Sequence, residues 1–164
     1  MSLSPQRAQE KTDGMIEKYQ DTVYRVAVAL LKNTADADDV FQEVFLRYFR
    51  RQPDFQDETH EKAWFIRVTI NRCKKLMTSA WYKRTEGLSP ATPLSSDWEA
   101  GYNEASELFA AVMTLPDLYR TVIHLYYYEG YPVREIASIL RRKEATVQSQ
   151  LMRGRELLRR NLEE

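Results

Sequence analysis

The segment from Tyr131 to Arg160 constrains the fold of this chain most, because its pattern predicts two helices joined by a tight turn. Small and apolar residues recur in the second helix at i, i+4, i+7 and i+11, and these are Val147, Leu151, Gly154 and Leu158. The other face carries mainly hydrogen-bonding side chains, namely Gln148, Ser149, Met152, Arg153 and Arg155. This arrangement is typical of a helix-turn-helix, whose second helix enters the DNA major groove, where Gln and Arg can each form paired hydrogen bonds with a base. The alternative is a helical hairpin whose charged side chains only face solvent.

Apolar residues recur with a helical period in the rest of the chain, and no segment alternates convincingly as a strand would. Residues 1–12 are expected to form a loose polar leader, and residues 13–33 a first helix. Asp36 is a suitable N-cap for a second helix, which is expected to end before Pro53. A third helix is expected over residues 61–80.

A linker is predicted over residues 83–97, because Gly, Pro, Ser and Thr are frequent there and disfavour a long regular element. Helix is expected to resume near Trp98, with Pro116 in the first turn of a further helix and Gly130 at its end. The fold class is therefore expected to be all-α, with two small helical domains joined by a flexible linker and the helix-turn-helix in the second domain. The expected boundaries are 13–82 for the first domain, 83–97 for the linker and 98–164 for the second domain.

Composition excludes several classes of protein. The chain has 164 residues, of which 43% are hydrophobic, so it can form a buried core. It has no apolar run long enough to cross a bilayer and no signal-peptide pattern, which predicts a cytoplasmic protein without direct membrane insertion. The single cysteine, Cys73, excludes an internal disulfide and a cysteine-rich metal site, and its helical surroundings predict a core thiol.

Charge is distributed unevenly along a chain whose net charge is zero. Residues 62–84 contain seven basic residues and no acidic residue, and residues 131–160 contain eight basic and three acidic residues. The balancing acidic residues concentrate in segments 36–43, 54–61 and 97–107. Two basic blocks separated by acidic ones predict two surfaces for nucleic acid and at least one for a different partner.

Three motifs occur in a fixed order along the chain. They are ADDVFQEVF at Ala37–Phe45, AWFIRVTINR at Ala63–Arg72, and EIAxxL at Glu135–Leu140 followed by TVQSQLMRGR at Thr146–Arg155. In this order and spacing they resemble bacterial RNA polymerase sigma factors of the extracytoplasmic-function (ECF) group of the sigma-70 family. The resemblance covers about residues 15–80 and 105–160. It implies a protein that binds core RNA polymerase and promoter DNA, and that is commonly regulated by an anti-sigma protein.

The resemblance assigns a different task to each motif. The first is expected to dock on the clamp helices of core polymerase through Asp38, Asp39, Gln42 and Glu43. An acidic, amide-bearing helix face is a poor surface for DNA and a good one for protein, although acidic residues there also favour the helix dipole.

The second motif is expected to hold an unstacked base and the backbone of the melted downstream promoter element. The residues expected to bind DNA there are Lys62, Trp64, Arg67, Asn71, Arg72, Lys74 and Lys75. Trp64 and Phe65 could stack on a base, but packing in the core is the favoured interpretation of Trp64. Asn71 matches a family asparagine that helps to read a base of this element.

The last motif is expected to read the duplex upstream element. Gln148, Ser149, Met152 and Arg153 should face base edges, and Arg155 should lie nearer the DNA backbone. The chain departs from the family in the turn, where Arg141, Arg142 and Lys143 replace a common Gly, apolar residue and Ser or Pro. This departure predicts a weakly anchored turn with a poor N-cap. At positions 148 and 150, Gln replaces the usual basic residues, so the upstream sequence that is read should differ from that of relatives.

No motif predicts catalysis, a cofactor or a metal site. His60 and His124 are far apart in sequence and neither belongs to a ligand or nucleophile motif. Two alternatives to a sigma factor remain from the residues alone. One is a stand-alone helix-turn-helix regulator that does not act through polymerase, and the other is a helical protein-interaction module whose binding depends little on salt.

Overall fold

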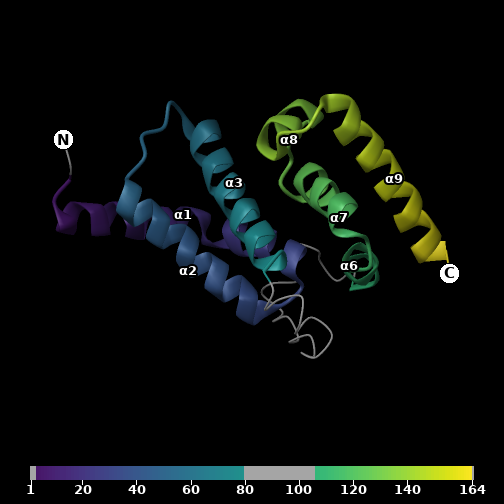
Figure 1. Cartoon of the computed structure of the whole chain (residues 1–164), viewed down its shortest axis with the longest axis horizontal. Helices are drawn as coiled ribbons and strands as arrows, with labels where there is room; N and C mark the ends of the chain where they lie inside the picture. Colours follow the sequence, from purple (N-terminus) through teal and green to yellow (C-terminus); the bar gives the residue numbers. More distant parts are fainter. Residues whose placement is uncertain (1–2, 80–105, 164) are drawn as a thin grey trace. The chain divides into compact units, whose positions relative to one another are not determined.

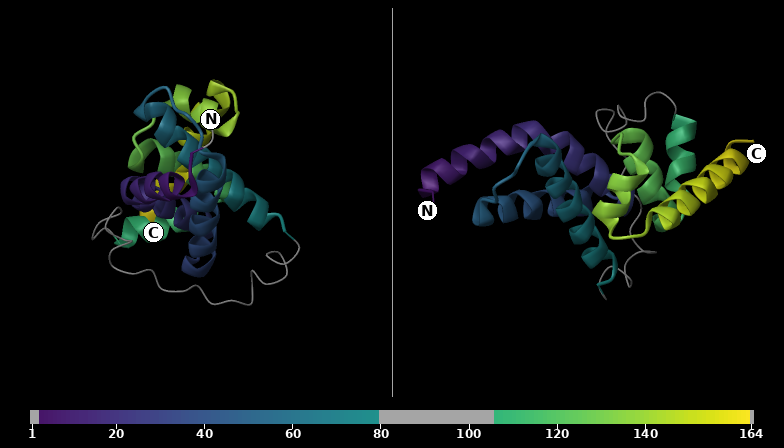
Figure 2. Two further views of the ribbon diagram at one scale, coloured as in Figure 1. Left: turned by 90° about the vertical axis from the view of Figure 1, so that its left-hand side faces the viewer. Right: turned by 90° about the horizontal axis from the view of Figure 1, so that it is seen from above.

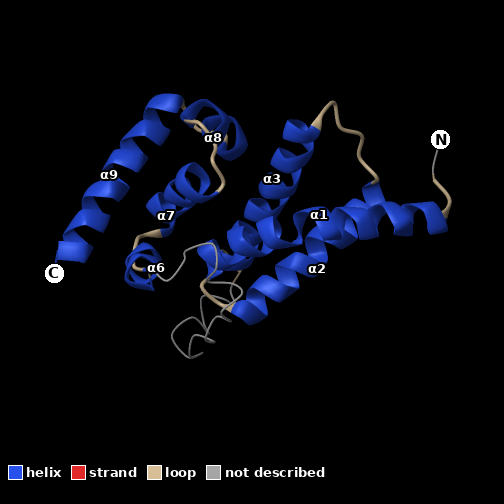
Figure 3. Cartoon of the chain, turned by 180° about the vertical axis from the view of Figure 1, so that it is seen from behind, coloured by secondary structure: helices blue, strands red, loops and turns tan. Residues whose placement is uncertain are grey.

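The computed structural model describes residues 3–79 and 106–163. Every regular element in these two stretches is a helix (Figure 1, Figure 3). The chain divides into two compact units, an N-terminal unit of residues 1–92 and a C-terminal unit of residues 93–164. The predicted all-α fold with two domains is confirmed. The predicted linker at 83–97 and the expected helix start near Trp98 lie outside the described residues.

Three helices lie in the described part of the N-terminal unit: α1 (Pro5–Leu31), α2 (Thr34–Arg51) and α3 (Glu58–Met77). Between α1 and α2, Lys32 takes a left-handed conformation with φ 60°, and its N–H donates to the carbonyl of Val28 over 2.8 Å. This reversal lets α2 pack back along α1, and α3 crosses both helices (Figure 2).

The first helix begins earlier than the sequence predicted, because residues 5–12 belong to it instead of forming a loose leader. The hydroxyl of Ser4 accepts a hydrogen bond from the N–H of Arg7 over 3.3 Å, and Pro5 occupies the first turn, where its missing N–H costs nothing. Ala8 and Thr12 are buried. The polar sequence of this segment hid these local start signals.

The other two helix starts also differ by a few residues from the expectation. Asn33, and not Asp36, caps α2, since its side-chain oxygen accepts hydrogen bonds from the N–H groups of Ala35 (2.8 Å) and Asp36 (3.1 Å). Asp57 caps α3 by accepting from the N–H of His60 over 2.8 Å, so that helix begins at Glu58. In each case a cap of suitable geometry lies one turn before the apolar pattern.

The core of the N-terminal unit is built around Phe65. Its ring lies 4.7 Å from that of Tyr19 on α1, and 5.4 Å and 5.6 Å from those of Phe45 and Tyr48 on α2, centroid to centroid. Cys73 is fully buried on the same side of α3, as predicted, and this burial raises the pKa of its thiol. One aromatic side chain thus joins all three helices.

Over residues 106–163, the C-terminal unit contains five short or medium helical elements around a second core. They are α6 (Ser106–Met113), α7 (Asp117–Ile123), the π-helix η1 (His124–Tyr128), α8 (Val133–Leu140) and α9 (Glu144–Glu163). The long helix α9 packs against α6, α7 and α8. Gly130, with φ 74°, ends the α7–η1 segment as the sequence predicted. None of the helices in the described parts of either unit is long and apolar enough to cross a membrane.

The turn between α8 and α9 is better anchored than its sequence suggested. Arg141 has the left-handed conformation (φ 55°) that ends many helices, and the N–H of Arg142 donates to the carbonyl of Ala137 over 2.9 Å. The half-buried side chain of Arg142 donates from Nη1 to Oε1 of Gln150 over 2.8 Å, and its burial lowers the pKa of the guanidinium. An arginine hydrogen bond to α9 therefore replaces the apolar anchor, and the predicted weak anchoring is wrong.

Arg141→Gly is expected to stabilise the C-terminal unit by about 1 kcal/mol. The left-handed conformation of Arg141 costs roughly that amount for a residue with a Cβ, and glycine does not have this cost. Thermal unfolding followed by circular dichroism would measure the change. Gly130→Ala, which adds a Cβ at another residue with positive φ in this unit, should have the opposite sign. A loss of stability in Arg141→Gly would show that the exposed Arg141 side chain contributes more than the backbone strain.

Candidate polymerase-binding and DNA-binding surfaces

The acidic face of α2 is on the surface of the N-terminal unit. Its members Asp38, Asp39, Gln42 and Glu43 are all exposed. The neighbouring Asp36 is partly buried, and this burial, with the charge of Asp39 as a smaller cause, raises the pKa of its carboxyl group. Beside this face, a groove between α2 and α3 is lined by Asp39, Gln42, Glu43 and Leu46 from α2 and by Arg72 and Lys75 from α3.

An ion pair connects this face to α3. Arg72 donates from Nε to Oε2 of Glu43 over 2.6 Å, and its Nη2 also contacts that oxygen. The sequence assigned these two residues to different partners, Glu43 to polymerase and Arg72 to DNA. In the free protein each neutralises the other at the α2–α3 boundary, where Glu43 is exposed and Arg72 is half-buried.

The structure groups five of the seven candidates on α3 into one stripe. Counted from Trp64, they recur at i, i+3, i+7, i+10 and i+11, which keeps them on one side of a helix with 3.6 residues per turn. They are Trp64, Arg67, Asn71, Lys74 and Lys75. Lys62 falls outside this stripe in the first turns of the helix, and Arg72 lies at its edge towards α2. The Nε of Arg67 is buried and has no hydrogen-bond partner among the described residues.

The two aromatic candidates on α3 have different positions. Phe65 is fully buried in the core, so it cannot stack on a base, contrary to that expectation. Trp64 is half-buried and makes edge-on contacts with Phe65 (4.9 Å), Tyr48 (6.0 Å) and Phe55 (5.9 Å), centroid to centroid. Trp64 therefore packs in an aromatic cluster.

A cluster that the sequence analysis did not identify holds the start of α3. The hydroxyl of Tyr19 donates to Oε1 of Glu61 over 2.6 Å, and Lys18 pairs with Glu61 (2.7 Å) and Glu58 (2.6 Å). Burial, followed by the hydrogen bond to Glu61, raises the pKa of Tyr19 to about 12. These contacts tie α3 to α1 just before the basic stripe begins. The residues are far apart in sequence, so no local pattern could reveal them.

The predicted recognition face of α9 is exposed along its length. Gln148, Ser149, Met152, Arg153 and Arg155 are all exposed, whereas Val147, Leu151 and Gly154 are buried. Gly154 allows close approach to α7, because a Cβ there would lie 3.0 Å from Cγ1 of Ile123. The helical period therefore correctly separated the exposed face of α9 from its buried face.

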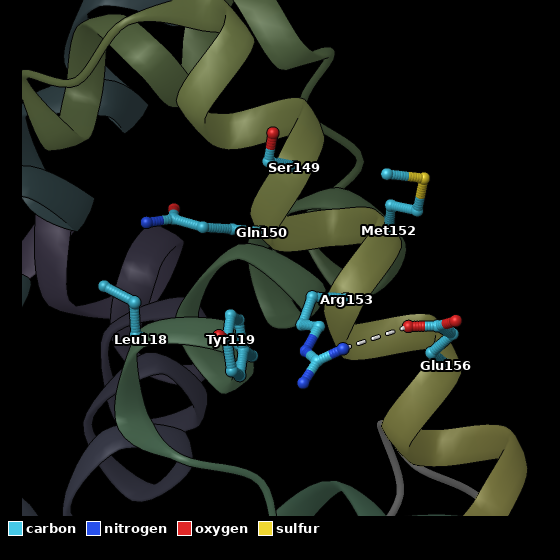
Figure 4. Close-up of a pocket in the computed structure, with 7 residues that line it drawn as sticks. All are labelled: Leu118, Tyr119, Ser149, Gln150, Met152, Arg153 and Glu156. Atoms are coloured by element: carbon cyan, nitrogen blue, oxygen red, sulfur yellow. Dashed lines mark hydrogen bonds and ion pairs between the residues drawn. The ribbon is translucent and has the colours of Figure 1, made fainter.

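The two arginines of this face lie in different surroundings. Arg153 forms a long ion pair with Glu156 (3.5 Å) and lines a pocket with Leu118 and Tyr119 of α7 (Figure 4). Arg155 donates from Nε to the hydroxyl of Tyr127 over 2.6 Å. Its guanidinium also lies over the rings of Tyr126 and Tyr127, at 5.5 Å and 5.7 Å from their centroids.

Gln150 lines the same pocket but was not among the predicted site residues. It is 8% exposed, and its oxygen accepts a hydrogen bond from Arg142 of the turn. The unusual residues at 142 and 150 thus form a contact with each other. Among residues 3–79 and 106–163, no group of acidic, histidine and cysteine side chains could hold a metal ion.

Comparisons with known proteins assign both parts of the chain to one family. Residues 15–82 match the family described as sigma-70 region 2, and residues 105–158 match the one described as sigma-70, region 4. The chain is 33% identical over 163 residues to the ECF RNA polymerase sigma factor SigE of Mycolicibacterium smegmatis, and this match covers 94% of the chain and 62% of the relative. It is 30% identical over 162 residues to SigW of Bacillus subtilis, with coverage of 90% and 87%.

A solved structure supports the fold. The sigma factor RpoE of Bartonella quintana, determined in complex with the anti-sigma factor NepR, matches with a TM-score of 0.77 at 18% identity, and the match covers 94% of this chain and 98% of that one. The chain belongs to the sigma-70 family of bacterial RNA polymerase sigma factors and to its ECF group. It is a transcription initiation factor that directs RNA polymerase to promoters, and it is not an enzyme.

Proposed function

We propose that this sigma factor divides its work among three helix faces. The acidic face of α2 docks on core polymerase, the stripe on α3 binds the melted downstream element, and the exposed face of α9 reads the duplex upstream element. The observation that carries this proposal is the separation of charge. The α2 face exposes carboxylates and an amide, while the α3 and α9 faces expose arginine, lysine and amide side chains.

The α3 stripe suits a single strand of DNA. Arg67, Lys74 and Lys75 supply cations for phosphates, and Asn71 is exposed between them to contact a base. Trp64 forms the packed end of the stripe, and Lys62 and Arg72 contribute to the positive potential around it.

The α9 face suits the edges of base pairs. Gln148, Ser149 and Met152 lie on adjacent turns, and Arg153 borders them. Arg155 is oriented by Tyr127, which leaves its other guanidinium nitrogens for the DNA backbone. Gln148 replaces a basic residue of the family and is exposed, and we propose that it shifts the recognised sequence towards adenine.

We further propose a cytoplasmic location and control by an anti-sigma protein. The location is that of the polymerase with which the family works. The anti-sigma partner is proposed because the fold matches a sigma factor that was solved in complex with one. Residues 83–97 are proposed to be the tether between the two DNA-binding domains.

Binding to purified core RNA polymerase followed by run-off transcription from a promoter library tests the function as a whole. Stoichiometric binding with promoter-dependent transcripts is expected, and the transcripts would reveal the recognised sequence. Folded protein that binds duplex DNA but not polymerase would support a stand-alone regulator instead. Binding that barely changes with salt, and requires no DNA, would support an interaction module.

Arg153→Ala is expected to weaken recognition of the upstream element by about 5-fold to 150-fold, as loss of one good base contact costs roughly 1–3 kcal/mol. Affinity for core polymerase should not change. Competition between promoter variants bound by the holoenzyme would measure both the affinity and the preference. Arg159→Ala, at an exposed arginine nearly two turns further along α9, is the matched control. An equal loss of affinity on all sequences in Arg153→Ala would assign Arg153 to the backbone.

A further inference from the structure

The second half of α2 exposes an arginine cluster that the docking proposal does not use. Arg50 and Arg51 are exposed and Arg47 is half-buried, and no ion pair joins any of the three to another residue in the described parts of the chain. They line a shallow groove together with Glu43, Leu46 and Arg72. Arginine side chains that are left without a carboxylate in the free protein are available to a partner.

This cluster continues the acidic face of α2. Asp39, Glu43, Leu46 and Arg50 recur at i, i+4, i+7 and i+11, which keeps them on one stripe about 16 Å long. Leu46 lies between the two charged halves, and it is a large apolar residue that is nevertheless 45% exposed. The stripe therefore runs from acidic through apolar to basic, and the pair between Glu43 and Arg72 lies near its middle.

We propose that the whole stripe is one docking surface and that its arginine half binds carboxylates of core polymerase. This inference rests on the proposed docking role of α2 and specifies the partner's chemistry. The polymerase segment lying along α2 must present basic side chains opposite Asp39 and Glu43, an apolar side chain opposite Leu46, and acidic side chains opposite Arg47 and Arg50. Such a complementary order fixes both the register and the direction in which the segment lies.

A protein partner fits this stripe better than a nucleic acid. A phosphate backbone carries the same charge throughout, so it would gain at Arg50 but be repelled by Asp39 and Glu43 on the same stripe. The exposed Leu46 needs an apolar contact, which a phosphate backbone does not supply. Arginine is also enriched at protein interfaces, where its planar group can hold a carboxylate through two hydrogen bonds.

Charge reversal of the arginine half tests the proposal. Arg47→Glu/Arg50→Glu in the full chain is expected to weaken binding to core polymerase by about tenfold or more. Arg47→Gln/Arg50→Gln removes the charges without placing acids near the end of α2, and should lose less. Arg7→Glu/Lys11→Glu, which makes the same change in net charge on exposed positions of α1, should bind normally. Circular dichroism would confirm that each variant is folded.

The outcomes separate this inference from the proposed function. If Asp39→Arg weakens binding but neither arginine variant does, the docking role stands and the extension to the arginine half is wrong. If none of the α2 variants alters binding, both are wrong. If the arginine variants bind core polymerase normally but the holoenzyme releases promoter DNA faster, the cluster contacts phosphates and the inference is also overturned.

A cross-link gives direct evidence for the carboxylate. Arg50→Lys keeps the charge and adds an amine, which a zero-length carbodiimide can couple to a carboxylate in contact with it. The expected product in the assembled holoenzyme is a peptide in which the amine introduced at position 50 is joined to an Asp or Glu of core polymerase. Lys11, which is exposed on α1, is the internal control and should give no such product. Absence of the cross-link at position 50 in a stable holoenzyme would contradict the contact.

Discussion

Asp39→Arg/Gln42→Arg is expected to weaken binding to core RNA polymerase by about 100-fold, while recognition of free promoter DNA is retained. Both side chains are exposed on the acidic face of α2. With the docking proposed above, reversing one charge and adding another there places two cations against a polymerase surface that binds carboxylates. Disrupted charge pairs at the centre of an interface cost roughly 2–5 kcal/mol, which corresponds to such a loss in affinity.

The chain offers a matched control for this change. Gln9 and Asp13 are exposed on α1 at i and i+4, and Gln9 donates to Asp13 over 3.1 Å. Gln9→Arg/Asp13→Arg makes the same chemical changes on the same unit, and should lose only the few tenths of a kcal/mol of that local contact. Fluorescence anisotropy with purified core polymerase would compare the two variants. Equal binding by both would exclude the acidic face of α2 from the polymerase interface.

Arg120→Ala is expected to destabilise the C-terminal unit strongly and leave the N-terminal unit folded. Arg120 is 1% exposed, its Nη1 donates to the carbonyl of Leu115 over 2.5 Å, and its Nη2 pairs with Asp117. Alanine would leave a cavity and a buried carbonyl without its donor, at a combined cost of about 3–5 kcal/mol. A unit of about 70 residues has a total stability of roughly 4–11 kcal/mol, so this change removes much of it.

Hydrogen exchange read by mass spectrometry would follow the two units separately. Amides of α7 and α9 should lose protection in Arg120→Ala, while those of α1 and α3 keep it. Promoter recognition should be lost together with the protection of α7 and α9. Binding to core polymerase should be weakened far less. Arg134→Ala, at an exposed arginine of α8, is the control and should change stability by less than about 0.5 kcal/mol. Full protection of α7 in Arg120→Ala would show that the buried arginine is dispensable.

Local residue patterns were sufficient to predict which face of a helix is buried and which is exposed. The period of Val147, Leu151 and Gly154 predicted the buried side of α9, and therefore also which side chains would be exposed. Helix starts were less predictable, since Asn33 and Asp57 act through hydrogen bonds that the apolar period does not include. The start of the first helix was also missed, because Ala8 and Thr12 are small and their burial depends on neighbouring helices.

The amino-acid sequence by itself determined the all-helical class, the two domains, the family motifs and the two basic segments, because each depends on residues near one another along the chain. The tertiary structure decided which side chains contact one another and which are buried. It pairs Glu43 with Arg72, joins Arg142 to Gln150, and places Phe65 in the core beside the half-buried Trp64. Such contacts depend on how helices pack and on which side chains exclude water, and residues distant in sequence carry no local signal of either.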